Sequence, residues 1–239
     1  MAKKTGNRLK NLFRKLWIFF IRIITLFFQV SLLLIIFYRV VPVPLTPLHI
    51  ERLYEQAVDG KSFKLSKSWK SIDYISDKFC LAVITSEDVK FMDHYGFDFE
   101  QIQNAVERNY KNGKKLRGAS TITQQTAKNL FFTPKRSWIR KIPEIGITIA
   151  LELLWTKKRI LEVYVNIIEM GDGIYGIEAA SQYYFHKSAT VITSRESALI
   201  ACCLPNPRKW RADKPTAFIN RKAAIVQHYI PYIPKLPWR

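Results

Sequence analysis

A long apolar run near the N-terminus constrains this chain more than any other feature. From Trp17 to Tyr38 the sequence is WIFFIRIITLFFQVSLLLIIFY, in which Arg22 is the only charged residue. A helix of about 20 such residues crosses the hydrocarbon core of a bilayer, and a charge near its end can extend towards the headgroups. We therefore predict one transmembrane helix over residues 17–39.

The flank before this run predicts its orientation. Residues 1–16 contain six Lys or Arg residues and no acidic residue, and such basic flanks stay in the cytoplasm. We expect a cytoplasmic tail over 1–16, a single pass through the membrane, and a following domain outside the cytoplasm. A cleaved signal peptide is the alternative, but the apolar run exceeds the roughly 7–15 residues of a signal core, and no small-residue cleavage site follows.

The next segment, residues 40–47, contains three prolines and predicts a stiff, extended spacer. The chain up to Pro47 holds eight basic residues and no acidic one, which leaves 30 Lys or Arg against 19 Asp or Glu in the remainder, a net charge of +11. The remainder is therefore itself basic. This charge favours an anionic partner, which can be nucleic acid, an acidic membrane surface or phosphate on a small ligand.

Residues 48–239 predict one all-α domain. Apolar residues recur with the period of a helix, without sustained period-2 alternation, and the end of the chain, with three prolines, is expected to be irregular. Asp98, Ser120 and Thr156 are expected helix caps, and Thr193 with Glu196 forms a predicted capping box. Cys80, Cys202 and Cys203 match neither a disulfide framework nor a zinc site, so we expect small core residues. The predicted helices cover about 76–87, 99–111, 120–131, 137–155, 157–169, 174–185 and 194–204.

Two polar clusters interrupt these apolar patterns. The first, SEDVKFMDHYGFD, places Glu87 at the end of an apolar helix, and the second runs from GASTITQQTAKN to RKIPE, which ends in Glu144. Partial desolvation suits a carboxylate to proton transfer, and paired carboxylates are the usual equipment for chemistry at an anomeric carbon. Several cations between the two acids could bind phosphate. The spacing alone predicts a site with two acids and several cations.

These residues resemble the monofunctional biosynthetic peptidoglycan glycosyltransferases, a family shared with the glycosyltransferase domains of class A penicillin-binding proteins. The first motif, ED-x-x-F-x-x-H-x-G-x-D, is matched by Glu87, Asp88, Phe91, His94, Gly96 and Asp98. The second, G-x-ST-x-x-QQ-x-x-KN, is matched by Gly118, Ser120, Thr121, Gln124, Gln125, Lys128 and Asn129. The third, RK-x-x-E, is matched by Arg140, Lys141 and Glu144, and the fourth by Lys157, Ile160, Leu161, Glu162, Tyr164, Asn166 and Gly171.

The resemblance implies a lysozyme-like helical fold and polymerisation of lipid II into β-1,4 glycan strands for the bacterial cell wall. It implies that a glycan on undecaprenyl pyrophosphate is the donor, and that the 4-hydroxyl of the incoming GlcNAc inverts the donor's anomeric carbon. The anchor, the spacer and the lack of a following transpeptidase domain fit the stand-alone form. Implied partners are lipid II, the membrane and other cell-wall synthesis or division proteins, with no nucleic acid. The implied location is a bacterial cytoplasmic (inner) membrane, with an extracytoplasmic or periplasmic catalytic domain.

The resemblance also implies roles for residues. Glu87 is the expected general base, and Glu144 is the expected second acid, near the leaving pyrophosphate. Substrate or pyrophosphate binding is expected of Ser120, Thr121, Gln124, Gln125, Lys128, Asn129, Arg136, Arg140 and Lys141. Structural roles are expected of Asp88, Phe91, His94, Gly96, Glu162, Tyr164 and Asn166. No organic cofactor is expected; a divalent cation, Mg²⁺ or Mn²⁺, at the pyrophosphate is a candidate, and its ligands are unknown.

Some of these assignments have simpler alternatives. Ser120 can be an N-cap, Lys141 can be solvated, and Pro143 is expected to kink the helix that carries Glu144. Two other functions also stay open. A lytic enzyme of the same fold would cut glycan, yet it has little use for cations at the leaving group. A membrane-tethered nucleic-acid binder would use the net charge, yet its domain would lie outside the cytoplasm. Phe131, Phe132, Trp138 and Trp155 are candidates for contact with lipid.

Overall fold

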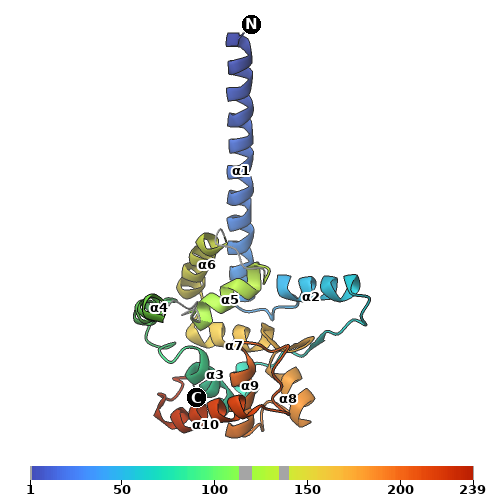
Figure 1. The fold of residues 1–239 in the computed structure, drawn as a ribbon, viewed down its shortest axis with the longest axis vertical. Helices are drawn as coiled ribbons and strands as arrows, with labels where there is room; N and C mark the ends of the chain where they lie inside the picture. Colours follow the sequence, from blue (N-terminus) through green and yellow to red (C-terminus); the bar gives the residue numbers. More distant parts are fainter. Residues whose placement is uncertain (1, 113–119, 135–139, 239) are drawn as a thin grey trace. The chain divides into compact units, whose positions relative to one another are not determined.

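The computed structural model describes residues 2–112, 120–134 and 140–238, and it divides the chain into two units, residues 1–41 and 42–239. The first unit is helix α1 (Ala2–Tyr38), which includes the predicted span and continues through the basic tail (Figure 1). Its segment Lys10–Tyr38 is long and apolar enough to cross a membrane. The transmembrane prediction therefore rests on a continuous helix that exposes apolar side chains.

The second unit is mainly helical, as predicted. Its helices are α2 (Pro47–Val58), α3 (Asp77–Glu87), α4 (Phe99–Asn112), α5 (Ile122–Phe131), α6 (Lys141–Leu154), α7 (Lys157–Ile167), α8 (Ile177–Phe185), α9 (Ser194–Cys203) and α10 (Ala217–Tyr229). Short 3₁₀ turns cover Ile72–Tyr74 and Ile230–Tyr232. The seven predicted helices are confirmed as α3 to α9, whereas α2 and α10 were not predicted.

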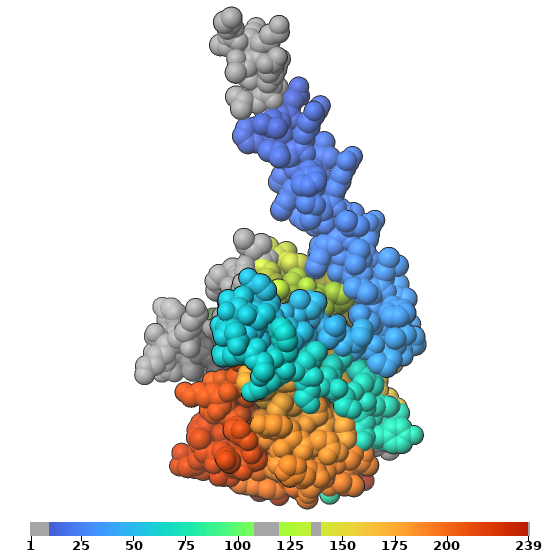
Figure 2. Space-filling model, turned by 90° about the vertical axis from the view of Figure 1, so that its right-hand side faces the viewer, coloured from blue at the N-terminus to red at the C-terminus, as the bar shows by residue number. Residues whose placement is uncertain are grey.

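A small sheet replaces two predicted helix ends. Its strands, β1 (Ser66–Lys67), β2 (Glu169–Gly171) and β3 (Ile174–Tyr175), run in the order β1-β3-β2, with β1 parallel to β3. Predicted helix 157–169 therefore ends at Ile167, and predicted helix 174–185 begins at Ile177. On the face in Figure 2, the segment after α2 lies beside the later chain that carries this hairpin and α8.

Most predicted helix starts are confirmed, with one correction. The side chains of Thr156 and Thr193 accept hydrogen bonds from the third helical N–H, and Asp98 accepts one from Gln101 in the same way. The predicted cap at Ser120 is wrong by one residue, because Thr121 caps α5 and forms a capping box with Gln124. The box satisfies backbone groups that have no partner within the helix.

Helix α2 begins inside the segment that we predicted as a spacer. Pro47 is its first residue, where proline is well tolerated because the missing N–H has no partner within the helix. The preceding Thr46 donates its backbone N–H to His49 Nδ1 at 3.0 Å, which closes a capping box. Upstream of this cap, the Lys67 ammonium donates to the carbonyls of Val43 and Pro44. The segment after the anchor is therefore fastened to the second unit.

Two helix groups build the core around the candidate site. Helices α3, α9 and α10 pack together, and α5 packs against both α6 and α7. Phe79, Ile84 and Phe91 are fully buried at the first group, and Cys80, Cys202 and Cys203 are buried as predicted. This arrangement brings the end of α3 next to the start of α5, although 34 residues separate Asp88 from Ile122.

Candidate active site

Glu87, the last residue of α3, is partly buried and meets the amide of a glutamine from α5. Gln125 Nε2 donates to Glu87 Oε2 at 3.1 Å, and the Ser86 hydroxyl lies 3.3 Å from Glu87 Oε1. The Tyr164 hydroxyl from α7 donates to Gln125 Oε1 at 3.0 Å. Tyr164 is fully buried, and burial, followed by the charges of Glu87 and Asp88, raises the pKa of its phenol well above the ordinary value. Three elements thus converge on one carboxylate.

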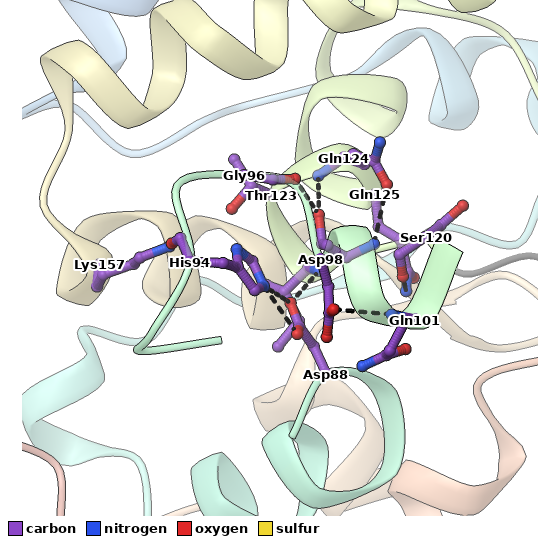
Figure 3. A network of polar contacts seen from close by, with 12 residues as sticks. Asp88, His94, Gly96, Asp98, Gln101, Ser120, Thr123, Gln124, Gln125 and Lys157 are labelled. Carbon is purple, nitrogen blue, oxygen red and sulfur yellow. Dashed lines mark hydrogen bonds and ion pairs between the residues drawn. The ribbon is translucent and has the colours of Figure 1, made fainter. Parts of the chain in front are cut away.

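Asp88, which caps the end of α3, fastens this helix to two neighbours (Figure 3). Its carboxylate accepts the backbone N–H of Ile122 at 2.9 Å and contacts His94 Nε2 at 2.9 and 3.1 Å. Only 1% of Asp88 is exposed. His94 therefore makes a hydrogen bond within its own turn.

The loop before α4 is bound to the cap of α5. The Thr121 hydroxyl donates to the carbonyl of Gly96 at 2.7 Å and accepts the backbone N–H of Gln124 at 3.2 Å. Gly96 has φ +82°, and a Cβ there would lie 2.8 Å from Thr148 Cγ2. Glycine is therefore required at this close approach. Thr121 and Gln124, which were expected to bind substrate, both form hydrogen bonds of the helix cap.

A partly buried acid, which sequence reasoning missed, supports the same loop. Glu152 Oε1 accepts hydrogen bonds from Thr123 Oγ1 at 2.5 Å and from Lys157 Nζ at 2.8 Å. Lys157 also donates to the carbonyl of His94 at 2.6 Å and lies 4.6 Å from the centroid of the Phe91 ring. The sequence signal was an acid at the end of an apolar helix, five residues before a lysine, and we did not use it.

Glu144 lies in the first turn of α6, and only 3% of it is exposed. One carboxylate oxygen is 3.1 Å from Arg140 Nε and the other is 3.1 Å from Lys141 Nζ. The first backbone bond of the helix runs from Glu144 N–H to the Arg140 carbonyl. Pro143 therefore occupies a position whose N–H has no partner within a helix. The expected kink is wrong, because Pro143 belongs to the first turn and not to the helix interior.

The other expected phosphate ligands lie on α5 and around the start of α6. Lys128 is one turn beyond Gln125 on α5 and is partly buried, and the neighbouring Asn129 is buried. The Arg140 guanidinium donates to the Thr133 carbonyl at 2.9 Å. The carbonyl of Ser120 accepts a hydrogen bond from Gln125 Nε2 at 3.4 Å. Arg136 and Trp138 lie outside the described residues.

Two side chains of α7 hold the segment that leads into α3. Glu162 Oε1 accepts the backbone N–H of Ile72 at 3.0 Å. Asn166 bonds both backbone groups of Lys70, accepting its N–H at 2.8 Å and donating to its carbonyl at 2.9 Å. Both residues therefore make bonds to the backbone that place the start of the α3 segment.

Among the residues that the structure describes, no three His, Cys, Asp or Glu side chains gather as a metal site. Glu144, the acid expected near a pyrophosphate, has a cation beside each carboxylate oxygen. These described residues do not fit a protein-built metal cage. They fit a site in which the protein supplies positive charge directly.

The chain is similar to known proteins over most of its length. A family model described as "Transglycosylase" matches residues 55–229. A Bdellovibrio bacteriovorus protein named "Biosynthetic peptidoglycan transglycosylase" is 44% identical over 220 residues, which cover 92% of this chain and 87% of the relative. Proteins of the same name from Haemophilus influenzae and Escherichia coli are 44% and 46% identical over 205 and 190 residues. Those alignments cover 85% and 79% of this chain, and 85% and 78% of the relatives.

Proposed function

This chain belongs to the transglycosylase family of peptidoglycan glycosyltransferases, which serve cell-wall synthesis, and we propose that it polymerises lipid II with inversion at the anomeric carbon and release of undecaprenyl pyrophosphate. The observation that supports this proposal is the difference between the contacts of the two expected acids. Glu87 accepts a hydrogen bond from the Gln125 amide and lies beside the Ser86 hydroxyl, whereas Glu144 lies between Arg140 and Lys141. One environment suits proton transfer, and the other suits an anionic leaving group.

In the proposed reaction, Glu87 is the general base. The 4-hydroxyl of the GlcNAc on lipid II attacks C1 of the donor sugar and passes its proton to the Glu87 carboxylate. The new C1–O4 bond forms on the face opposite the departing oxygen, so an α linkage becomes β. The hydrogen bond from Gln125 favours the charged carboxylate, which is the form that can accept a proton.

The cations act on the leaving group. The C1–O bond to the pyrophosphate breaks as O4 attacks, so negative charge on the diphosphate grows towards the transition state. Lys128, Arg140 and Lys141, together with Arg136, are the proposed ligands of that charge. Cations at such a position lower the barrier because they bind the transition state more tightly than the ground state. Glu144 would hold Arg140 and Lys141 in place for this purpose.

We propose no protein-built metal site. A divalent cation, if the reaction uses one, would be coordinated mainly by pyrophosphate oxygens, because the Glu144 oxygens already face cations. Polymerisation in the presence of EDTA, with and without added Mg²⁺ or Mn²⁺, measures that requirement directly.

The proposed location is a bacterial inner membrane, with the N-terminus in the cytoplasm and the catalytic unit outside it. A membrane-bound substrate and an N-terminal helix able to span a membrane support this location. Helix α6 adds a second apolar surface, because Ile142, Ile145, Ile149 and Leu153 are between 46% and 79% exposed. These side chains recur at helical spacing along one side of α6. Of the aromatic residues considered for lipid contact, Trp155 is buried and Phe131 and Phe132 are partly buried.

The test is polymerisation of labelled lipid II by the full-length protein in detergent. We expect long glycan from the wild type and at least a thousandfold less from Glu87→Gln and from Glu144→Gln, with both variants folded. Glu100→Gln is the matched control, since Glu100 is exposed on α4 and pairs with Lys90. Cleavage of preformed glycan with lipid II left untouched would instead support a lytic enzyme and reject the proposal.

A further inference from the structure

We propose that Gln125 is a positioning residue that keeps the Glu87 carboxylate ionised and aimed, and that Tyr164 sets which end of the Gln125 amide meets Glu87. The proposal deepens the proposed function and rests on it, since Glu87 is the base only if the reaction is glycan polymerisation. It also changes the expected role of Gln125, which the family resemblance placed among the ligands of substrate or pyrophosphate.

The hydrogen-bonding capacity of Gln125 supports this change. A carboxamide has two N–H donors and one carbonyl oxygen. Gln125 Nε2 uses its donors on Glu87 Oε2 at 3.1 Å and on the Ser120 carbonyl at 3.4 Å, and Oε1 accepts from Tyr164 at 3.0 Å (Figure 3 shows the Ser120 side). Because both donors face protein oxygens, Gln125 has no N–H directed at a phosphate.

The direction of the amide matters because its two ends act oppositely on a carboxylate. An N–H donor stabilises the ionised form, whereas a carbonyl oxygen facing the carboxylate repels it and favours the protonated form. Tyr164 supplies a proton that needs an acceptor inside the core, and Gln125 Oε1 is that acceptor. Once Oε1 is turned towards Tyr164, Nε2 must face Glu87. The phenol therefore selects the orientation that a general base needs.

The charged and titratable groups around Glu87 define what else could shift its protonation. Asp88 follows it in the chain, the Tyr164 phenol reaches it from α7, and the Cys202 thiol lies near it on α9. Lys128 is one turn beyond Gln125 on α5. Asp88 is a like charge, and the thiol and phenol are neutral groups. A directed N–H bond is the contact from Gln125 that opposes the effect of Asp88.

The test is the pH profile of kcat/KM for lipid II polymerisation by the full-length protein. In Tyr164→Phe, the Gln125 amide is free to reverse, so we expect the acidic limb to move to higher pH by about one unit. Gln125→Met keeps the side-chain length and removes the donor, and it should move the limb by a similar amount. The double variant should show no further shift, because both changes break one chain of contacts.

Tyr184→Phe is the matched control. Tyr184 is also buried and donates its hydroxyl to the Met170 carbonyl at 3.0 Å, so its loss removes a comparable bond elsewhere in the unit. We expect lower thermal stability and an unmoved acidic limb. If Tyr164→Phe does not fold, Gln125→Met alone decides the question.

Two results would overturn the inference. The inference is rejected if folded Gln125→Met keeps the acidic limb of the wild-type pH profile. If that variant also shows a raised KM for lipid II, Gln125 is a substrate ligand, as the family resemblance implied. A wild type that polymerises no lipid II would reject the proposed function itself. The two failures are therefore distinguishable.

Discussion

Asp88 accepts a hydrogen bond from the backbone N–H of Ile122 at 2.9 Å, across 34 residues of chain. The bond joins the end of α3 to the first turn of α5, where N–H groups lack partners within the helix. The Asp88 carboxylate therefore satisfies an N–H group in the first turn of α5, as a capping side chain would, although Asp88 belongs to another part of the fold. Since Glu87 precedes Asp88 and Gln125 follows Ile122 by three residues, the same bond helps to hold the Gln125 amide near the Glu87 carboxylate.

Replacing Asp88 tests this junction. In Asp88→Asn, one of the two oxygens that face Ile122 N–H and His94 Nε2 becomes an NH₂ group and can no longer accept a hydrogen bond, so we expect a loss of about 1–3 kcal/mol in the free energy of unfolding. Thermal unfolding of the detergent-solubilised protein measures it. Asp98→Asn is the comparison, because asparagine caps a helix as well as aspartate does. Equal losses in both variants would show that the Ile122 contact is not the cause.

Gly96 provides a test of the loop beside the site. Gly96→Ala would strain a residue at φ +82° and place its Cβ 2.8 Å from Thr148 Cγ2 and 3.1 Å from Glu152 Cγ. We expect a loss of more than about 2 kcal/mol and reduced polymerisation. Gly60 has a similar positive φ, but a Cβ added there would meet no atom within 4 Å. Gly60→Ala should therefore lower the free energy of unfolding by only about 1 kcal/mol. Similar melting temperatures for the two variants would contradict the packing argument.

Pro143 is expected to be replaceable. Its position in the first turn of α6 lacks a hydrogen bond in any case, so Pro143→Ala should change the free energy of unfolding by less than about 1 kcal/mol and leave glycan synthesis intact. Ala150→Pro places proline in the interior of the same helix and should cost about 3 kcal/mol. A large loss of activity in Pro143→Ala would mean that proline itself directs Glu144.

His49 should make stability depend on pH. Burial, followed by the positive charge of Lys67, lowers the pKa of His49 to about 4, while an unfolded histidine keeps a pKa near 6.5. Between these values the unfolded chain binds the extra proton, so this contribution is present above pH 6.5 and is lost as the pH falls towards 4. Lowering the pH from 7.5 to 5 should cost the wild type about 2 kcal/mol.

His49→Asn isolates that dependence. The Asn carbonyl oxygen can replace Nδ1 as the acceptor for the Thr46 N–H, but it does not titrate. Melting temperatures at pH 7.5 and 5 should therefore fall less for the variant than for the wild type. Parallel losses in the two proteins would assign the acid sensitivity to other groups.

Local sequence patterns predicted the helices that carry the site. The apolar period predicted α3, α5 and α7, and Thr193 with Glu196 correctly marked the start of the neighbouring helix α9. Helix α2 was not predicted, and its first residue, Pro47, was assigned to the proline spacer although it lies where a helix accepts proline. Strands of two or three residues are too short for a period-2 signal.

The contacts within the site were less predictable, because they depend on packing between elements. Nothing in the sequence places Tyr164 against Gln125, 39 residues apart, or directs the two N–H donors of that amide to Glu87 and Ser120. The motifs identified the residues, whereas the partners of Gln125 follow from the packing of α5 against α7 and from the bond that joins α3 to α5. A residue expected to touch substrate can therefore have its polar groups satisfied by the protein.

The fastening of Val43 and Pro44 by Lys67 has a consequence for how substrate is found. Helix α1 ends at Tyr38, and Lys67 binds the carbonyl of Val43, so the chain between these two residues can span no more than roughly 18 Å. With α1 in a bilayer, so short a connecting segment would keep the catalytic unit close to the lipid surface. Encounter with a lipid-linked sugar then becomes a search in two dimensions, and turnover should follow the surface density of the lipid and not its bulk concentration.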